Sequence, residues 1–427
     1  MSRGPLTGLV SELVVSFDFP PQVGGAHLWL YEVYRRWGSE VSVLTEQYSS
    51  DPAVAEAQLG FDRGEDGSLR IHREAPRLAA IDLLHPACLR AFWSQSAAIA
   101  RLSAGRATRL HALRAFPEGF AALLYKTLHP RSCQLITYAH GEEVLIARTS
   151  LQLKLMAKRV YSASDLVIAN SENTRRFVHD LCPGARVVCI HPGVDAAAFA
   201  RDEKAGAAYR AQWPWPSGTV VVCTVARMEA RKNHAAIIRA IGELRKKGLP
   251  VAYVCGGDGP ERENLATLVA DMELRQWVSF PGRLSERDKR QVHSAADVYA
   301  MPAIQTGEMI EGFGIVFLEA AASELPSISG NTGGQPEAVL DGRTGFVVDG
   351  SDPRAVAATI AKLARDPALR ASMGRAGREW AAQHDWPCVV TNTRAELEGL
   401  CRLPTRDEAA QTVSQVTKGR ARRFSKT

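Results

Sequence analysis

The sequence of 427 residues contains no C-x-x-C pair and no compact group of cysteines and histidines. These absences argue against a zinc ribbon and against a thioredoxin-like redox centre. Several of the cysteines lie in apolar runs, such as Cys223 in VVVCTVA. We therefore predict buried free thiols in a reducing compartment. The eight cysteines are Cys88, Cys133, Cys182, Cys189, Cys223, Cys255, Cys388 and Cys401.

Long apolar runs are also missing. No stretch approaches the roughly 20 apolar residues of a membrane-spanning helix. The opening MSRGPLTGLVSELVVSF has no apolar segment followed by a small-residue cleavage site, as a secretory signal would. We expect a cytoplasmic protein whose contact with a membrane, if it has one, is peripheral.

The charge balance is mild, with 52 lysines and arginines against 46 acidic residues and a net charge of +6. This excess is no nucleic-acid signature, and we expect no nucleic-acid partner. It is compatible with acidic ligands, phosphorylated substrates and anionic membrane surfaces. The hydrophobic content of 46% is typical of a folded protein, and the length suits two domains of about 200 residues each.

The second half of the chain alternates short β-branched runs with helical patterns. TVVVCTVA (219–226) predicts a strand, HAAIIRAIGELRKKG (234–248) a helix, and VAYVC (251–255) the next strand. Such alternation is typical of a parallel sheet covered on both faces. Further strands are predicted in WVSFPG, DVYAMPA, LPSISG and GFVVD.

The first half repeats this pattern less clearly, with a helix predicted over 24–38. Strands are predicted over 13–18, 40–45, 133–139, 165–170 and 185–190. The fold class is therefore α/β, with two doubly wound, Rossmann-like domains and a cleft between them. We place the first domain at 1–195 and the second at 196–385, with the join in the Gly- and Pro-containing stretch 191–218.

The stretch EGFGIVFLE (311–319) places two carboxylates around two glycines. The helical pattern begins near Gly314, and a helix start attracts anions through its unpaired N–H groups. Gly312 and Gly314 leave room for a ligand to approach the backbone. Glu319 could bind a ribose and Glu311 a polyhydroxylated group beyond a phosphate. Alternatively, Glu311 caps the helix and Glu319 is solvated.

Three other stretches follow predicted strands. ARMEARKNH (226–234) carries Arg227 and Lys232, two cations that could stabilise a departing diphosphate, although a solvated charge run is the alternative. FPPQVGG (19–25) ends in Gly24 and Gly25, which suit a close approach to phosphate. YAHGEEV (138–144) places His140 beside a glycine, where a structural role is also open.

A nicotinamide-binding fingerprint is absent from FPPQVGG, where the spacing is not G-x-G-x-x-G. GGDGPE (256–261) is closer, but no acidic residue sits at a second strand end, so we predict a turn there. The basic segment 402–427 is predicted to be a disordered tail, and contact with an anionic membrane is the alternative. The basic stretch 148–162 is either an ordinary surface helix or a second membrane contact.

Taken together, these stretches resemble the retaining glycosyltransferases of family 4, which have the GT-B fold. Glu311 and Glu319 match the E-x7-E pattern of that family, and Arg227 and Lys232 match its diphosphate-binding pair. The resemblance runs from FPPQVGG to about Trp386. Its other landmarks occur in order as IANSENTRRF, IHPGVDAAAF, GGDGPE, VSFPGRLSERD and GGQPEAVLDGRTGFVV.

The resemblance implies roles for matching residues and a helix over 386–401 that crosses back to the first domain. The implied catalytic residues are His140, Arg227, Lys232 and Glu311. The implied donor-binding residues are Gly24, Gly25, Gly312, Phe313, Gly314, Ile315 and Glu319. The first domain would bind the acceptor and the second domain the nucleotide sugar.

The implied reaction is hexosyl transfer from a nucleotide-diphosphate sugar with retention, by front-face attack. No cofactor and no metal is required, because Arg227, Lys232 and a helix end would stabilise the negative charge that a metal ion would otherwise stabilise. Within the family, these motifs most resemble those of mannosyltransferases that use GDP-mannose. UDP-glucose and UDP-N-acetylglucosamine are the alternative donors. The acceptor is a carbohydrate, a lipid-linked sugar or a small molecule, in glycolipid, polysaccharide or natural-product glycoside synthesis. We expect a monomer or weak dimer.

Two other functional classes are alternatives to this interpretation. A non-hydrolysing sugar-nucleotide epimerase would share the fold but lack an acceptor. A catalytically silent binding module would have no chemical reason to keep Glu311, Glu319, Arg227 and Lys232 together.

Overall fold

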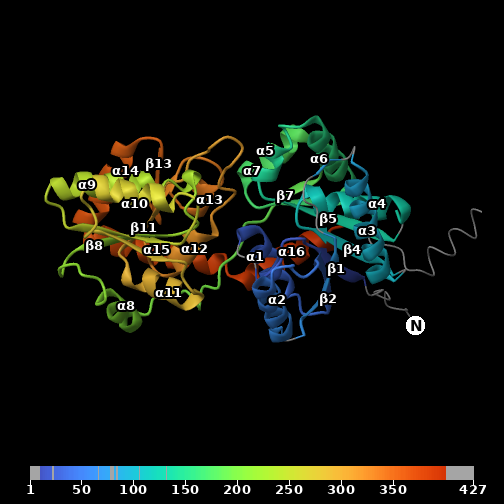
Figure 1. Ribbon diagram of the computed structural model, residues 1–427, viewed down its shortest axis with the longest axis horizontal. Helices are drawn as coiled ribbons and strands as arrows, with labels where there is room; N and C mark the ends of the chain where they lie inside the picture. Colours follow the sequence, from blue (N-terminus) through green and yellow to red (C-terminus); the bar gives the residue numbers. More distant parts are fainter. Residues whose placement is uncertain are drawn as a thin grey trace, which may run out of the picture. The chain divides into compact units, whose positions relative to one another are not determined.

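The computed structural model describes residues 10–400, apart from 22–23, 66, 77–80, 83–84, 105 and 131. The predicted tail at 402–427 lies outside these residues. The chain forms two compact units (Figure 1). The N-terminal unit comprises the described parts of 1–169, 175–190 and 390–400. The C-terminal unit comprises 170–174 and 191–389.

The N-terminal unit is built on a sheet of seven parallel strands in the order β3-β2-β1-β4-β5-β6-β7. The central strand β1 lies between β2 and β4, with Val14 paired to Val43 and to His111. The strands are β1 (Ser11–Val15), β2 (Val41–Glu46), β3 (Leu69–Ala75), β4 (Thr108–Ala112), β5 (Cys133–Ala139), β6 (Leu166–Ala169) and β7 (Val187–Cys189).

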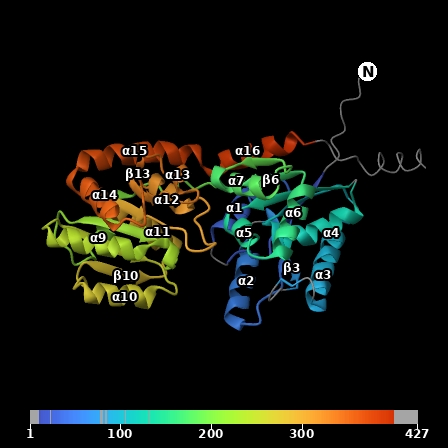
Figure 2. The same ribbon diagram turned by 90° about the horizontal axis from the view of Figure 1, so that it is seen from above.

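Helices lie on both sides of this sheet because alternate strand residues are apolar on each face. On one face, Leu13 and Val15 join a core that includes Phe92 of α3 and Val160 of α6. Figure 2 shows α3, α4 and α6 beside one another. The helices are α1 (Gly25–Tyr34), α2 (Pro52–Gly64), α3 (Pro86–Ser103), η1 (Ala115–Gly119), α4 (Phe120–Leu128), α5 (Glu142–Ile146), α6 (Leu151–Ala163) and α7 (Glu172–Leu181).

Strands β3 and β4 were not predicted, and both carry polar residues. β3 (LRIHREA) is an edge strand of the sheet, so it lacks the apolar run of a central strand. In the inner strand β4, Arg109 and His111 both bond to Glu12 of β1, at 2.8 and 2.6 Å. Cross-strand pairing therefore buries charge that a hydropathy pattern assigns to the surface.

The C-terminal unit contains six parallel strands in the order β10-β9-β8-β11-β12-β13. The strands are β8 (Val220–Val225), β9 (Val251–Gly256), β10 (Val278–Gly282), β11 (Val298–Met301), β12 (Ser327–Gly330) and β13 (Gly345–Val348). The helices are α8 (Glu203–Arg210), η2 (Ala230–Lys232), α9 (His234–Lys246), α10 (Arg262–Asp271), α11 (Glu286–Ala295), α12 (Ile315–Ala322), α13 (Gln335–Ala338), α14 (Pro353–Arg365), α15 (Pro367–Gln383) and α16 (Trp386–Glu398).

Two apolar cores sandwich this second sheet. Val222 and Tyr253 point into the core beneath α9 and α14, whereas Val221 and Val254 point into the core that includes α12. Figure 1 shows α9, α10 and α14 on one side of the strands and α8, α11 and α12 on the other. The two doubly wound sheets predicted from the sequence are confirmed.

The boundary between the units falls at Ile190/His191, whereas the sequence placed it at 195/196. Val194 belongs to the C-terminal unit because its N–H bonds to the carbonyl of His384 at 3.0 Å. The stretch 191–218, predicted as the join, contains α8, which packs against α11. The helix α16 starts in the C-terminal unit, and its residues from Val390 onward belong to the N-terminal unit.

The cysteines of the described chain are free thiols. Five of them are buried, as predicted: Cys88, Cys133, Cys182, Cys223 and Cys255. Two differ from the prediction, since Cys388 is exposed on α16 and Cys189 is half-buried at the end of the short strand β7. Cys401 lies outside the described residues.

Candidate active site

The predicted donor-binding residues follow strands of the C-terminal sheet. β8 ends at Val225 and its neighbour β11 ends at Met301. Because the strands are parallel, the loops 226–233 and 302–314 leave the same edge of the sheet. That edge is where ligands bind in open α/β sheets.

Glu311 is the centre of a charged group at this edge. One carboxylate oxygen, Oε2, accepts hydrogen bonds from Lys232 Nζ and, at 2.9 Å, from the Arg231 guanidinium. Burial alone would raise the pKa of Glu311, but Lys232 and Arg231 hold it below its ordinary value. Glu311 is therefore an ionised acceptor. The alternative that it caps α12 is wrong, because its carboxylate bonds to Lys232 and Arg231 and, within the described residues, the N-cap position of that helix has no side-chain cap.

Arg227 lies in the same loop but has another partner. Its guanidinium is 3.2 Å from Glu229 Oε1, and its side chain is 68% exposed. The other oxygen of Glu229 contacts Arg231 Nε at 3.0 Å. Arg227 and Lys232, predicted to converge on one point, are thus bound to different carboxylates in this structure. The exposed Arg227 has the greater freedom to turn toward a ligand.

The predicted helix start at Gly314 is confirmed, since α12 begins at Ile315. Gly314 has φ of 92°, and a Cβ atom there would lie 2.7 Å from the Phe317 ring. Before it, Phe313 is buried and stacks on the His191 ring, with centroids 4.8 Å apart. Gly312 therefore precedes an aromatic side chain that is held in place by stacking on His191. The start of α12 follows, and the N–H groups of a helix start favour anions.

Two glycines of the loop after β12 hold the 311–312 backbone in place. The N–H of Gly334 donates to the carbonyl of Glu311 at 2.9 Å. A Cβ atom on Gly334 would lie 2.0 Å from the carbonyl oxygen of Gly312, and one on Gly333 would lie 2.2 Å from that of Glu311. Only glycine allows this close backbone packing.

Glu319 lies in the second turn of α12 and is 4% exposed, so the alternative of a solvated Glu319 is wrong. Its Oε1 accepts a hydrogen bond from Lys289 Nζ at 2.8 Å. Its Oε2 is buried and has no hydrogen-bond partner among the residues that the structure describes. A buried carboxylate oxygen without a donor is well suited to a ligand hydroxyl group.

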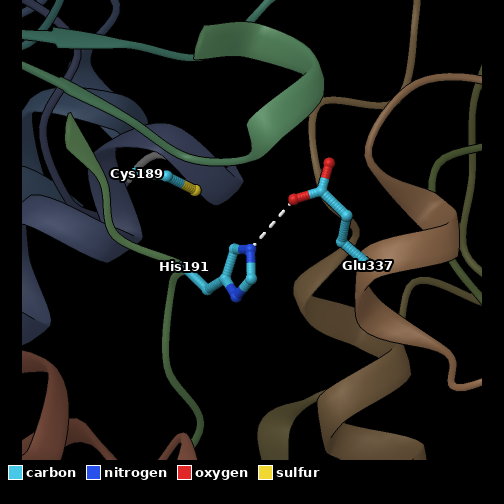
Figure 3. Close-up of side chains that lie close together, drawn as sticks. All are labelled: Cys189, His191 and Glu337. Atoms are coloured by element: carbon cyan, nitrogen blue, oxygen red, sulfur yellow. Dashed lines mark hydrogen bonds and ion pairs between the residues drawn. The ribbon is translucent and has the colours of Figure 1, made fainter. Parts of the chain in front are cut away.

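Glu337 is a further carboxylate of this unit, in α13. It accepts hydrogen bonds from the N–H groups of Glu172 and Asn173, and its Oε2 lies 3.0 Å from His191 Nε2 (Figure 3). These bonds hold its pKa below the ordinary value although burial opposes the shift. The third residue drawn, Cys189, belongs to the N-terminal unit, so we do not assign the three side chains to one metal site.

In the N-terminal unit, Gly24 precedes α1 and Gly25 is its first residue. Its N-cap residue Gly24 makes no side-chain cap hydrogen bond in the described part of the chain. A Cβ atom on Gly24 would lie 2.5 Å from the His27 ring, so the backbone approaches that ring closely. The predicted helix start with bare backbone is therefore present.

His140 follows β5 in the same unit. Its Nε2 donates to the carbonyl of Leu113 at 2.8 Å, and its own N–H donates to Glu143 at 2.7 Å. Burial lowers the pKa of His140 to about 3, and the nearby Arg114 charge acts in the same direction. The imidazole is neutral at physiological pH. Burial raises the pKa of Glu143 to about 7.

The sequence interpretation missed four residues of the C-terminal site. Arg231 and Glu229 stood within the quoted stretch RMEARKNH, but only the tertiary structure shows which carboxylates they bind. Gly334 stood within GGQPEAV, without any sign of its contact with Gly312. Lys289 had no sequence signal, because a lysine in a charged helix is usually solvated.

The sequence matches two family profiles that together cover most of the chain. Residues 23–198 match the profile described as Glycosyltransferase Family 4, and residues 207–380 match that described as Glycosyl transferases group 1. Within the described residues, no helix has both the length and the apolar character needed to cross a membrane.

Two curated relatives with high similarity to this chain are named as mannosyltransferases. The chain is 32% identical over 398 residues to a GDP-mannose-dependent alpha-(1-6)-phosphatidylinositol monomannoside mannosyltransferase of Mycobacterium tuberculosis, covering 91% of this chain and 98% of that protein. It is 38% identical over 287 residues to the enzyme of the same name from Mycolicibacterium smegmatis, covering 65% of this chain and 72% of that protein.

Solved structures support the fold. Anabaena Alr3699/HepE in complex with UDP and glucose superposes with a TM-score of 0.74 at 18% identity, covering 92% of this chain and all of that one. Sucrose-phosphate synthase from Thermosynechococcus elongatus also gives 0.74, at 20% identity, covering 91% and 98% of the two chains. With its two parallel sheets and its near full-length relatives, this chain belongs to glycosyltransferase family 4 and has the GT-B fold.

Proposed function

We propose that the chain transfers a mannosyl group from GDP-mannose to a hydroxyl group of a phosphatidylinositol mannoside, with retention of configuration and without a metal ion. The observation that carries this proposal is the match at 32% identity to 98% of the length of a mannosyltransferase of that donor and acceptor class. The residues at the edge of the C-terminal sheet agree with it, because they offer a set of contacts for a nucleotide sugar.

Each donor group has a chemically suited contact in the C-terminal unit. The buried, unpaired oxygen of Glu319 suits a ribose hydroxyl. The uncapped start of α12 and the cations Lys232 and Arg227 suit the diphosphate. The ionised Glu311 suits hydroxyl groups of the sugar. These assignments are part of the proposal, as are the roles of Gly24, Gly25 and His140 in the N-terminal unit.

In the proposed reaction, the bond between the sugar C1 and the diphosphate oxygen breaks while the acceptor oxygen bonds to C1 on the same face. The acceptor's proton passes to the departing diphosphate oxygen, so no side chain need act as nucleophile. Lys232 and Arg227 stabilise the negative charge that develops on the diphosphate. The neutral imidazole of His140 would contribute a hydrogen bond rather than a charge.

The proposal predicts that GDP-mannose and a phosphatidylinositol monomannoside, incubated with the purified protein and EDTA, give a lipid heavier by one hexose. Mass spectrometry measures the addition, and NMR of the product's anomeric centre measures its configuration, which we expect to be α. Thermal-shift measurements with GDP, UDP and ADP are expected to show the largest stabilisation by GDP.

Three results would contradict parts of this proposal. Transfer from UDP-glucose or UDP-N-acetylglucosamine but not from GDP-mannose would overturn the donor. A β-linked product would overturn retention, and loss of activity in EDTA would overturn metal independence. An epimerised nucleotide sugar formed from donor alone would replace transfer with the epimerase alternative.

We also propose that the N-terminal unit contacts an anionic membrane through the exposed face of α6. Leu151 and Leu155 are 73% and 54% exposed there, next to the exposed Lys154, Lys158 and Arg159. The helix contains no acidic residue. Apolar side chains among cations suit the boundary of an anionic lipid surface, where a glycolipid acceptor would reside.

Vesicle flotation tests this contact. The double variant Leu151→Glu, Leu155→Glu is expected to lose most binding to vesicles rich in phosphatidylglycerol, because each change removes apolar contact and adds repulsion. The control is Leu59→Glu, which alters a 38% exposed leucine on α2 of the same unit. Equal flotation of the double variant and the wild type would exclude α6 as the contact.

A further inference from the structure

The carboxylate of Glu319 is held by one partner only. Lys289 of α11 donates to Oε1 at 2.8 Å, while the buried Oε2 has no partner in the described part of the chain. Leaving a buried acceptor without a donor destabilises the folded chain, because the oxygen loses the hydrogen bonds it would make to water. Such an oxygen is most simply explained as the receiving atom for a bound molecule.

Lys289 is itself enclosed by groups that hold it as a cation. Its side chain is 14% exposed, and Nζ lies 2.8 Å from Glu319 and 3.1 Å from Glu286. The same Nζ lies 5.0 Å from the centre of the Phe199 ring. Burial alone would lower the pKa of Lys289, but Glu319 and Glu286 raise it above the ordinary value. The ammonium is charged wherever the protein is folded near neutral pH.

The two acidic partners of Lys289 differ in their surroundings. Glu286 is 74% exposed and follows the helix cap Ser285, so water can replace its contact. Glu319 is 6% exposed at its side chain and cannot be solvated in that way. The ion pair that matters for the site is therefore the one between Lys289 and Glu319, which lie on the two helices before and after β11.

The ion pair with Lys289 sets the orientation of the Glu319 carboxylate. A glutamate side chain has three rotatable bonds, and a single free carboxylate oxygen has no fixed direction. Anchoring Oε1 on Lys289 fixes the plane of the carboxylate and hence the position of Oε2. A preorganised acceptor binds a hydroxyl group without first losing its own rotamer freedom.

We propose that Lys289 is a positioning residue that orients Glu319 to accept hydrogen bonds from the vicinal hydroxyl groups of the ribose of a nucleoside diphosphate. This inference rests on the proposed function, which supplies the class of ligand. It adds the residue that determines how strongly the ribose is bound. A purely structural ion pair would stabilise the fold and leave that recognition unchanged.

The test compares GDP with 2′-deoxy-GDP and 3′-deoxy-GDP by titration calorimetry. For the wild type we expect at least one deoxy analogue to bind roughly 10–100-fold more weakly, as a hydrogen bond to a charged group implies. For Lys289→Met we expect weaker GDP binding and less than about threefold difference between GDP and the analogues. Lys289→Arg keeps the charge and is expected to restore part of the difference.

Kinetics give a second readout that a structural role would not produce. With GDP-mannose as donor, Lys289→Met should raise KM about tenfold with kcat changed less than about threefold, as expected for lost ground-state binding. The control Glu286→Gln removes the exposed partner of Lys289 and should leave ribose discrimination unchanged. Circular dichroism at each step establishes that the variants are folded.

The outcomes separate this inference from the proposed function. If the wild type binds GDP and discriminates against the deoxy analogues, the donor assignment stands. Full discrimination in Lys289→Met would then overturn the positioning role alone. Should that variant fail to fold, Lys289→Leu also removes the donor, and full discrimination there would overturn the positioning role equally. Absence of GDP binding by the wild type overturns the donor assignment and this inference with it.

Discussion

Replacing Lys232 with methionine is expected to lower turnover by about 100- to 1,000-fold, the usual effect of removing one group that stabilises developing negative charge. Lys232 bonds to Glu311 and is 11% exposed at its side chain. Methionine keeps an unbranched side chain that is one atom shorter and removes the charge. The change also leaves Glu311 with Arg231 as its remaining cationic contact in this group. Initial rates of mannosyl transfer at saturating donor measure the effect.

The matched control is Lys247→Met. Lys247 pairs with Glu243 at 2.5 Å in the same unit, but its side chain is 60% exposed, so the pair contributes little. We expect turnover within a factor of about two of the wild type. A Lys232→Met variant that is folded and retains more than a third of wild-type turnover would remove Lys232 from the proposed chemistry.

Replacing Gly334 with alanine is the second change with a large expected effect, although it adds a single methyl group. The new Cβ atom would lie 2.0 Å from the carbonyl oxygen of Gly312, so the 311–312 backbone must move. A displacement of about 1 Å at a reacting centre can cost about 100-fold in rate. We expect a loss of that order in kcat/KM, and a lower melting temperature because of the overpacking.

Gly184→Ala is the control for this variant. A Cβ atom at Gly184 would have no atom of the described residues within 4 Å, so neither rate nor melting temperature should change appreciably. Donor titrations add a mechanistic check, since a displaced 311–312 backbone should weaken sugar binding more than GDP binding. Wild-type kinetics in a folded Gly334→Ala variant would show that this loop does not position the EGFG stretch.

Much of the fold was predictable because strand and helix periodicities are local. β5 was predicted with its observed bounds, Cys133–Ala139, since it is a mostly apolar segment that is buried on both faces. β4 was not, because the polar Arg109 and His111 both bond to Glu12, which lies 97 and 99 residues away in the sequence. Local patterns contain no information about such distant partners.

The candidate site likewise has a part that could be predicted from local sequence and a part that could not. The loop and helix that carry Glu311, the glycines and Glu319 could be predicted from the sequence, because their spacing around a helix start is a local property. That Lys232 and Arg231 bond to Glu311, and that Gly334 packs on its backbone, follows only from the folded structure. So does the anchoring of one oxygen of Glu319 by Lys289. These contacts join segments that meet only after the parallel sheet has assembled, and a carboxylate's chemistry depends on the cations that this assembly places beside it.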